Sequence, residues 1–210
     1  MFIFINSLDY KSVTSFDLTA VMNLWLLIGS SILIFKCMRC EDRNFRVYID
    51  EVNITQVDTD VYEKFECKVY QMDNRTYMDS AHIFKRTIDD ITVHAVLDFW
   101  KLNSKQKMKL YDVEFDGCYI LENANKNRLF NMYVQNLKKH ATVKFKCPFR
   151  PNVNYEVKNL TMSEQDFPSF VPLGKFRSLL EYYTNRKLMA RVIARGQILP
   201  YSTDPFKVLE

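Results

Sequence analysis

The residues best suited to chemistry are three histidines and two acidic clusters. The histidines are His82, His94 and His140. Neither their spacing to one another nor their spacing to a cysteine matches that of a metal site. We expect each to be a surface or packed histidine. Asp89-Asp90 and a second acidic group could supply paired carboxylates (Asp112, Glu114, Asp116). On a strand, the three residues of the second group would lie on the same face. A face that is exposed to solvent explains such a row of carboxylates. The pattern predicts no catalytic residue and no metal.

Glycine is scarce, with four residues in 210 (Gly29, Gly117, Gly174, Gly196). Phosphate-binding loops need several glycines in a short stretch, because the backbone must approach the ligand closely. The chain also lacks a G-x-S-x-G nucleophile elbow. These absences argue against nucleotide enzymes and α/β-hydrolases. We expect a protein that is not an enzyme and needs no cofactor.

The formal net charge is +4, and the signs are interspersed along the chain. The densest basic stretch contains four lysines (Lys101, Lys105, Lys107, Lys109). Without a basic stripe or a base-stacking motif, a solvated loop and strand face explains it better than a nucleic-acid site. We expect no nucleic-acid partner.

The five cysteines fall into two groups. Cys37 and Cys40 form a C-x-x-C motif without the strand–helix context of a redox site, so we interpret them as the tail of a signal peptide. Cys118 and Cys147 each border a strand-like run and are the best disulfide pair. Their loop would stabilise the fold by roughly 3–4 kcal/mol. Cys67 is either a buried free thiol or the partner of Cys40.

An apolar, uncharged run of 12 residues spans 24–35. This length fits a signal-peptide core, whereas a membrane span needs about 20 residues. The charges that flank the run would leave the domain in the cytoplasm by the positive-inside rule. Translation from Met22 removes that conflict. We therefore expect residues 1–21 to be an N-terminal extension and residues 22–40 a signal peptide or anchor.

Three N-glycosylation sequons follow the apolar run, at Asn53, Asn74 and Asn159. Each alone is a weak signal, but three near strand ends or turns favour exposure to the secretory lumen. We expect a secreted protein. The alternative is a protein anchored by residues 19–35 with its domain outside the cell.

Residues 41–210 have the composition of one globular domain, since 48% of the chain is hydrophobic and 14% is aromatic. Apolar and polar residues alternate with the period of a strand in several segments. These segments are 45–52, 63–70, 81–87, 91–102, 109–116, 142–147, 155–160, 175–183 and 188–199. Asp73-Asn74 and residues 184–187 are turn signals. Apolar residues near helical spacing predict one amphipathic helix over 127–140. The fold class we expect is mostly β, an antiparallel immunoglobulin-like β-sandwich with one helix.

Several motifs in this order resemble a family of insect secreted proteins with an uncharacterised domain, which includes the chemosensory B proteins. The motifs are VYIDEVN, FECKVYQMDNRTY, LYDVEFDGCYILEN, FKCPFRPNVNYEVKNLT and PLGKFRSLLEY. The family is distantly similar to the MD-2-related and ganglioside-activator lipid-recognition domains. Relatives often carry a cysteine where this chain has Asn53 and Ile54, which puts a second family disulfide in doubt.

The resemblance implies that a hydrophobic or lipid-like ligand binds between two sheets, in chemosensory or reproductive signalling. It also implies a membrane receptor or channel as a partner. The cavity candidates are large apolar residues spread over the domain (Phe99, Phe115, Ile120, Phe130, Tyr133, Phe145, Phe176, Leu180, Tyr182). The same residues could equally fill a closed core. The alternative function is a secreted or membrane-tethered protein-interaction module without a small ligand.

Overall fold

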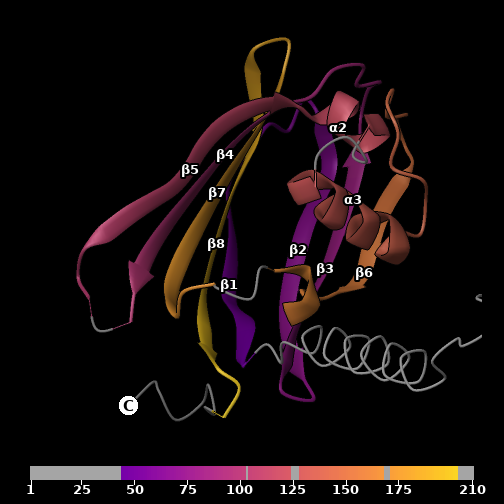
Figure 1. The fold of residues 1–210 in the computed structure, drawn as a ribbon. Helices are drawn as coiled ribbons and strands as arrows, with labels where there is room; N and C mark the ends of the chain where they lie inside the picture. The colour runs from indigo at the N-terminus through magenta and orange to yellow at the C-terminus, as the bar shows by residue number, and fades with distance from the viewer. Residues whose placement is uncertain (1–43, 103, 124–127, 168–170, 203–210) are drawn as a thin grey trace, which may run out of the picture. The chain divides into compact units, whose positions relative to one another are not determined.

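Eight antiparallel strands in two sheets make up most of the described part of the chain (Figure 1). The computed structural model describes residues 44–102, 104–123, 128–167 and 171–202, without the side chains of residues 128–130, 132 and 166. The expected segments 1–21, 22–40 and 19–35 lie outside these residues. The mostly β fold class predicted from the sequence is confirmed.

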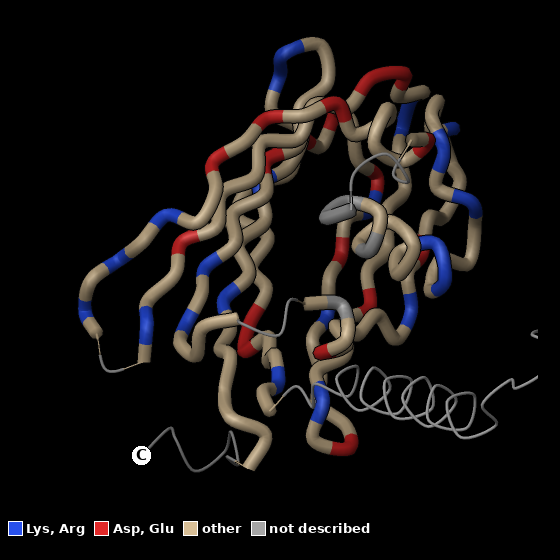
Figure 2. Tube along the Cα trace, in the orientation of Figure 1, with Lys and Arg blue, Asp and Glu red and all other residues tan. Residues whose placement is uncertain are grey.

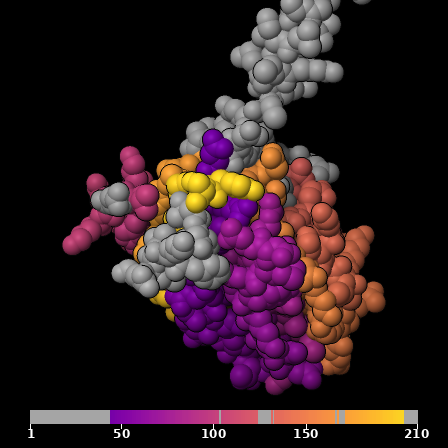
Figure 3. All heavy atoms as spheres, turned by 90° about the horizontal axis from the view of Figure 1, so that it is seen from below, coloured from indigo at the N-terminus to yellow at the C-terminus, as the bar shows by residue number. Residues whose placement is uncertain are grey.

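The larger sheet has five strands in the order β1–β8–β7–β4–β5. Their bounds are Phe45–Val57, Lys187–Pro200, Gly174–Thr184, Thr92–Lys101 and Lys107–Asp116. The smaller sheet has the order β2–β3–β6, with bounds Tyr62–Met72, Arg75–Phe84 and Asn154–Leu160. The two sheets meet along β1, where the Ile49 backbone N–H donates to Thr76 Oγ1 at 3.2 Å. From below, β1 lies beside β2 and β3 (Figure 3).

Two tight turns set the register of the hairpins. Asp73 and Asn74 join β2 to β3 with φ of 50° and 58°, and Asn185 and Arg186 join β7 to β8 with φ of 48° and 63°. Two successive positive φ values match the right-handed twist of hairpin strands. Both turn predictions are confirmed. The strand expected over 81–87 is the end of β3, which begins at once after its turn.

The prediction of one helix was incomplete. The helix α3 (Arg128–His140) follows the expected pattern, but α2 (Gly117–Asn123) precedes it. Asp116 starts α2, because its Oδ1 accepts the Tyr119 backbone N–H at 2.9 Å as an N-cap. A 3₁₀ turn, η2 (Glu164–Asp166), follows β6.

The strand expected over 142–147 was wrong. The segment has no ladder of strand hydrogen bonds. Ala141, just before it, forms an isolated bridge to Val157 of β6, and the Thr142 backbone N–H donates to the Glu156 carbonyl at 2.9 Å. Its apolar members Phe145 and Cys147 pack against one end of the core instead. The alternation therefore reflects the buried side of the segment and not strand pairing.

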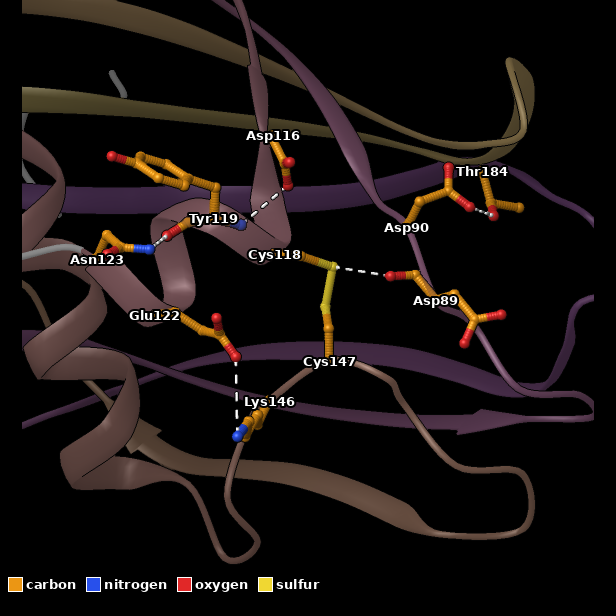
Figure 4. Close-up of a disulfide and its surroundings, with 10 residues drawn as sticks. All are labelled: Asp89, Asp90, Asp116, Cys118, Tyr119, Glu122, Asn123, Lys146, Cys147 and Thr184. Carbon is orange, nitrogen blue, oxygen red and sulfur yellow. Dashed lines mark hydrogen bonds and ion pairs between the residues drawn. A yellow bond between two sulfur atoms is a disulfide. The ribbon is translucent and has the colours of Figure 1, made fainter.

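The pair of cysteines expected from the sequence forms a disulfide (Figure 4). It joins Cys118 of α2 to Cys147, 29 residues later, with the Cα atoms 5.7 Å apart. Beside the bridge, Lys146 Nζ lies 3.9 Å from Glu122 Oε1 (Figure 4). The bridge fastens α2 to the segment that leads into β6. Cys67 is a partly buried free thiol.

Two buried clusters lie toward opposite ends of β4 and β7, since Tyr182 packs against one and Phe99 and Phe176 belong to or pack against the other. The first contains aromatic rings from the smaller sheet and a connecting segment (Tyr62, Phe84, Phe149, Tyr155), packed with Val61 and Ile88 and with Met189 and Ala190 of β8. The second contains Phe45, Val47, Phe99 and Ile198, with Phe167 beside η2 packed against it. We call these the first and the second end cluster. Their buried members are at most 7% exposed.

Candidate functional site

The register shows which side chains of the larger sheet face the smaller one. In β7, the alternate residues Phe176, Ser178, Leu180 and Tyr182 pair with Phe99, Leu97, Ala95 and Val93 of β4. On β8 they pair with Gly196, Ala194, Val192 and Ala190. The two ends of this row contact the two end clusters, so the whole row points into the space between the sheets.

The smaller sheet presents a matching row. Phe65, Cys67 and Val69 of β2 pair with His82, Ser80 and Met78 of β3. The Phe65 ring stacks on Tyr62 of the first end cluster, with 5.0 Å between ring centroids, which assigns this face to the interior. The opposite face carries a polar hollow of about 190 Å³, lined mainly by lysines and acidic residues (Lys64, Glu66, Lys68, Asp79, Glu156, Lys158), which also borders Ala81 and the inner-row residues Ser80 and Val157.

Most inward side chains in the middle of these two rows keep accessible surface. Between the end clusters, the inward side chains of five strands are only partly buried (Cys67, Val69, Met78, Ser80, Leu97, Ser178, Leu180, Val192, Ala194), whereas Ala95 in the same row is 5% exposed. We call this set the central band. Val113 of the edge strand β5 continues it and is 40% exposed. Inward apolar groups with accessible surface are what a ligand-sized space requires.

Phenol and thiol groups from four elements approach one another beside the central band. Burial raises the pKa of Tyr133 on α3, as do neighbouring Tyr111 of β5 and Cys67 of β2. Burial also raises the pKa of Tyr182 on β7 well above its usual range, with Tyr133 close by. Yet Tyr133 is 44% exposed and Tyr182 is only partly buried. These side chains therefore form one polar cluster with accessible surface beside the central band.

The nine cavity candidates occupy different places. Leu180 lies in the central band, Phe115 faces inward on β5, and Tyr133 approaches Cys67 from α3. Four others belong to the end clusters or pack against them (Phe99, Phe145, Phe176, Tyr182). Ile120 is partly buried in α2, and the side chain of Phe130 lies outside the described residues.

Sequence reasoning missed most of the central band. Cys67, Val69, Met78, Leu97 and Val192 were not among the candidates, although alternation places each on one face of a strand. The signal was therefore present. It could not be used because large aromatic residues were favoured, and several of them fill the ends of the core.

The three sequon asparagines are accessible to a modifying enzyme. Asn53, Asn74 and Asn159 are all exposed. Asn74 lies in the β2–β3 turn, where Tyr48 Oη donates to its Oδ1 at 3.1 Å. Their exposure agrees with the predicted glycosylation and leaves it a prediction.

The outer face of the larger sheet carries the histidine with the most polar contacts. His94 Nδ1 lies 2.9 Å from Glu181 Oε2, and Nε2 lies 2.7 Å from Asp112 Oδ1. Hydrogen bonds to these carboxylates raise the His94 pKa. Arg191 Nε also donates to Glu181, at 2.6 Å. Within the described residues no cluster has the donors of a metal site, and this group is an ion-pair network.

The four lysines of the basic stretch are exposed and lie in the β4–β5 hairpin (Figure 2). Lys107 approaches Asp98 at 3.6 Å, and Lys109 lies 2.5 Å from Asp112. The arrangement agrees with a solvated loop and strand face. Among the described helices, none has the length and apolarity of a membrane span.

Comparison with known proteins gives a partial family match. Residues 93–178 match the family described as Protein of unknown function (DUF1091). A search of curated proteins finds no match. Among solved structures, the chain is similar to a Niemann-Pick type C2 protein from Japanese carpenter ant, with 12% identity and a TM-score of 0.31 over 72% of this chain and 92% of that chain. Likeness at this level identifies no ligand. The family match therefore agrees with the resemblance to an uncharacterised family, and the ligand has to be inferred from the geometry.

Proposed function

We propose that this protein is secreted and binds one hydrophobic or lipid-like ligand between its two sheets. The observation that supports this function is the central band, whose apolar side chains face inward but keep accessible surface between the two end clusters. Covering such surface with a ligand is favourable by roughly 25 cal/mol per Å².

The energy available to an alkyl ligand is sufficient. Each buried methylene contributes about 0.8 kcal/mol, so a dozen contribute about 10 kcal/mol before the cost of association. After several kcal/mol are lost to ordering and association, a micromolar complex is expected.

Secretion and biological setting belong to the same proposal. The disulfide and the three exposed sequons are typical of a protein that matures in an oxidising compartment. The resemblance to the chemosensory B proteins suggests a role in chemosensory or reproductive signalling, with a membrane receptor or channel as partner. The alternative of an anchor at residues 19–35 also leaves the domain outside the cell.

The test is native mass spectrometry of the full chain secreted by insect cells. We expect a complex whose mass exceeds that of the glycosylated chain by one lipid, which denaturation releases. A control glycoprotein from the same medium should carry no such mass. A ligand-free protein that also fails to bind added lipid would contradict the proposal.

The second candidate function is a protein-interaction module with a filled interior. One observation favours it. β5 is an edge strand in the described sheet, and its residues Met108 and Leu110 are 40% and 50% exposed. An apolar edge of this kind can pair with another chain. This alternative predicts no co-purified lipid and a loss of partner binding in the variant Leu110→Lys.

A further inference from the structure

The charged side chains of the two sheets are excluded from the central band. Between the end clusters, the inner faces of the described strands carry no lysine, arginine, aspartate or glutamate. The intervening positions of the same strands carry many, all on the outer faces (Glu66, Lys68, Asp79, Asp98, Asp112, Glu114, Arg177, Glu181, Arg191, Arg195). The sheet alternation therefore separates a charged exterior from an uncharged interior.

Every polar group that remains on the inner faces is neutral at physiological pH. Burial lowers the His82 pKa to about 4, so its imidazole is uncharged. Burial and neighbouring Asp79 raise the Cys67 pKa to about 11, so its thiol stays protonated. Tyr111 and Ser178 share a hydrogen bond across the inner face. Hydroxyl, thiol and imidazole groups can satisfy a hydroxyl, ester or carbonyl group of a ligand, but they cannot neutralise an ion.

We propose that the ligand between the sheets is uncharged, such as a long-chain alcohol, ester, ketone, hydrocarbon or sterol, and that fatty acids and alkylamines are rejected. The inference rests on the proposed function and adds the chemical class of its ligand. Its physical reason is that a buried ion without a partner loses its hydration and gains nothing equivalent. A neutral head group loses much less, and the inner hydroxyls can replace its hydrogen bonds.

The experiment compares ligands with the same alkyl chain and different head groups. Purified protein is freed of lipid and loaded with Nile red, and the displacement by four competitors is measured at neutral pH. The competitors are hexadecanol, methyl hexadecanoate, hexadecanoic acid and hexadecylamine. We expect the acid and the amine to bind at least about 100-fold more weakly than the alcohol and the ester.

A difference below about tenfold between the acid and its methyl ester, or between the amine and the alcohol, would overturn the inference. In that case binding itself would still support the proposed function. Failure of all four competitors and of the probe to bind would instead contradict the proposed function. The two failures are therefore distinguishable.

A pair of variants tests whether the central band determines the preference. Leu180→Lys places a cation at an inner position next to Ala95, whereas Leu179→Lys places one on the outer face opposite Val96. We expect Leu180→Lys to strengthen binding of the acid at least about tenfold and to leave the ester unimproved. Leu179→Lys should change neither. An equal effect of both variants would overturn the assignment, and the comparison in the unmodified protein decides the matter if Leu180→Lys does not fold.

Discussion

The substitution Leu180→Trp distinguishes a ligand-binding interior from a filled core. Leu180 lies in the middle of β7, between Ala95 of β4 and Val192 of β8, and is only partly buried. In a filled core a larger ring would overpack, at a cost of typically 1–3 kcal/mol. Next to an open space the ring can occupy that space. We therefore expect the free energy of unfolding of the lipid-free variant to change by less than about 0.5 kcal/mol.

The expected effect on binding follows from the methylenes that the ring displaces. If the indole occupies the volume of three ligand methylenes, binding weakens by about 2.4 kcal/mol, which corresponds to a roughly 60-fold higher Kd. Unfolding free energy would be measured by urea denaturation of lipid-free protein, and Kd by displacement of Nile red. The two measurements separate loss of the site from loss of the fold.

Ala190→Leu provides the matched control. Ala190 belongs to the same sheet but lies in the first end cluster and is completely buried. Here extra methylenes should destabilise by the usual 1–3 kcal/mol. If Leu180→Trp destabilises as much as Ala190→Leu and the unmodified protein binds neither Nile red nor lipid, the interior is a filled core, and the proposed function is wrong.

Three other predictions concern the exterior, the disulfide and pH. Glycosidase treatment of the secreted protein should increase its gel mobility, and each Asn→Gln variant should remove one step (Asn53, Asn74, Asn159); an unchanged mobility would contradict glycosylation. Replacing both cysteines of the disulfide by alanine should lower the free energy of unfolding by about 3–4 kcal/mol, and peptide mapping without reductant should recover the linked pair; two alkylatable thiols in the folded protein would reject the pairing. The His82 pKa is near 4 in the folded state against 6.5 as its ordinary value, so the unfolded state binds more protons in this window, and stability should fall as the pH drops from about 6.5 to 4. Over this pH range, urea denaturation should show a smaller loss of unfolding free energy in His82→Gln than in the unmodified protein, with a difference of at most about 3 kcal/mol. An identical pH dependence in the variant would refute the assignment.

Local sequence patterns were sufficient for most of the strands and for the disulfide. Alternation over 109–116 and 188–199 predicts strands because successive side chains point to opposite faces. Asp73-Asn74 predicts a hairpin turn because aspartate and asparagine tolerate positive φ. Cys118 and Cys147 were paired correctly, although only the run before Cys118 is a strand, β5. Each of these inferences uses only neighbours along the chain.

Two other elements were not predicted correctly from the local pattern. The run over 142–147 alternates, but only its first residue hydrogen-bonds to β6, and Phe145 and Cys147 pack against the first end cluster. Here tertiary packing overrides the local pattern. The short helix α2 was missed because its cap, Asp116, also ends β5.

The location of the candidate site was decided by tertiary structure alone. Phe99 and Leu97 share one face of β4, so the sequence by itself determines that both point inward. Only the second end cluster shows that Phe99 is 1% exposed, while Leu97 stays partly buried in the central band. The alternation along a strand specifies on which face of the sheet a side chain lies. How closely the opposite sheet approaches depends on side chains from η2, α3 and the disulfide segment, which the chain brings together only when it folds.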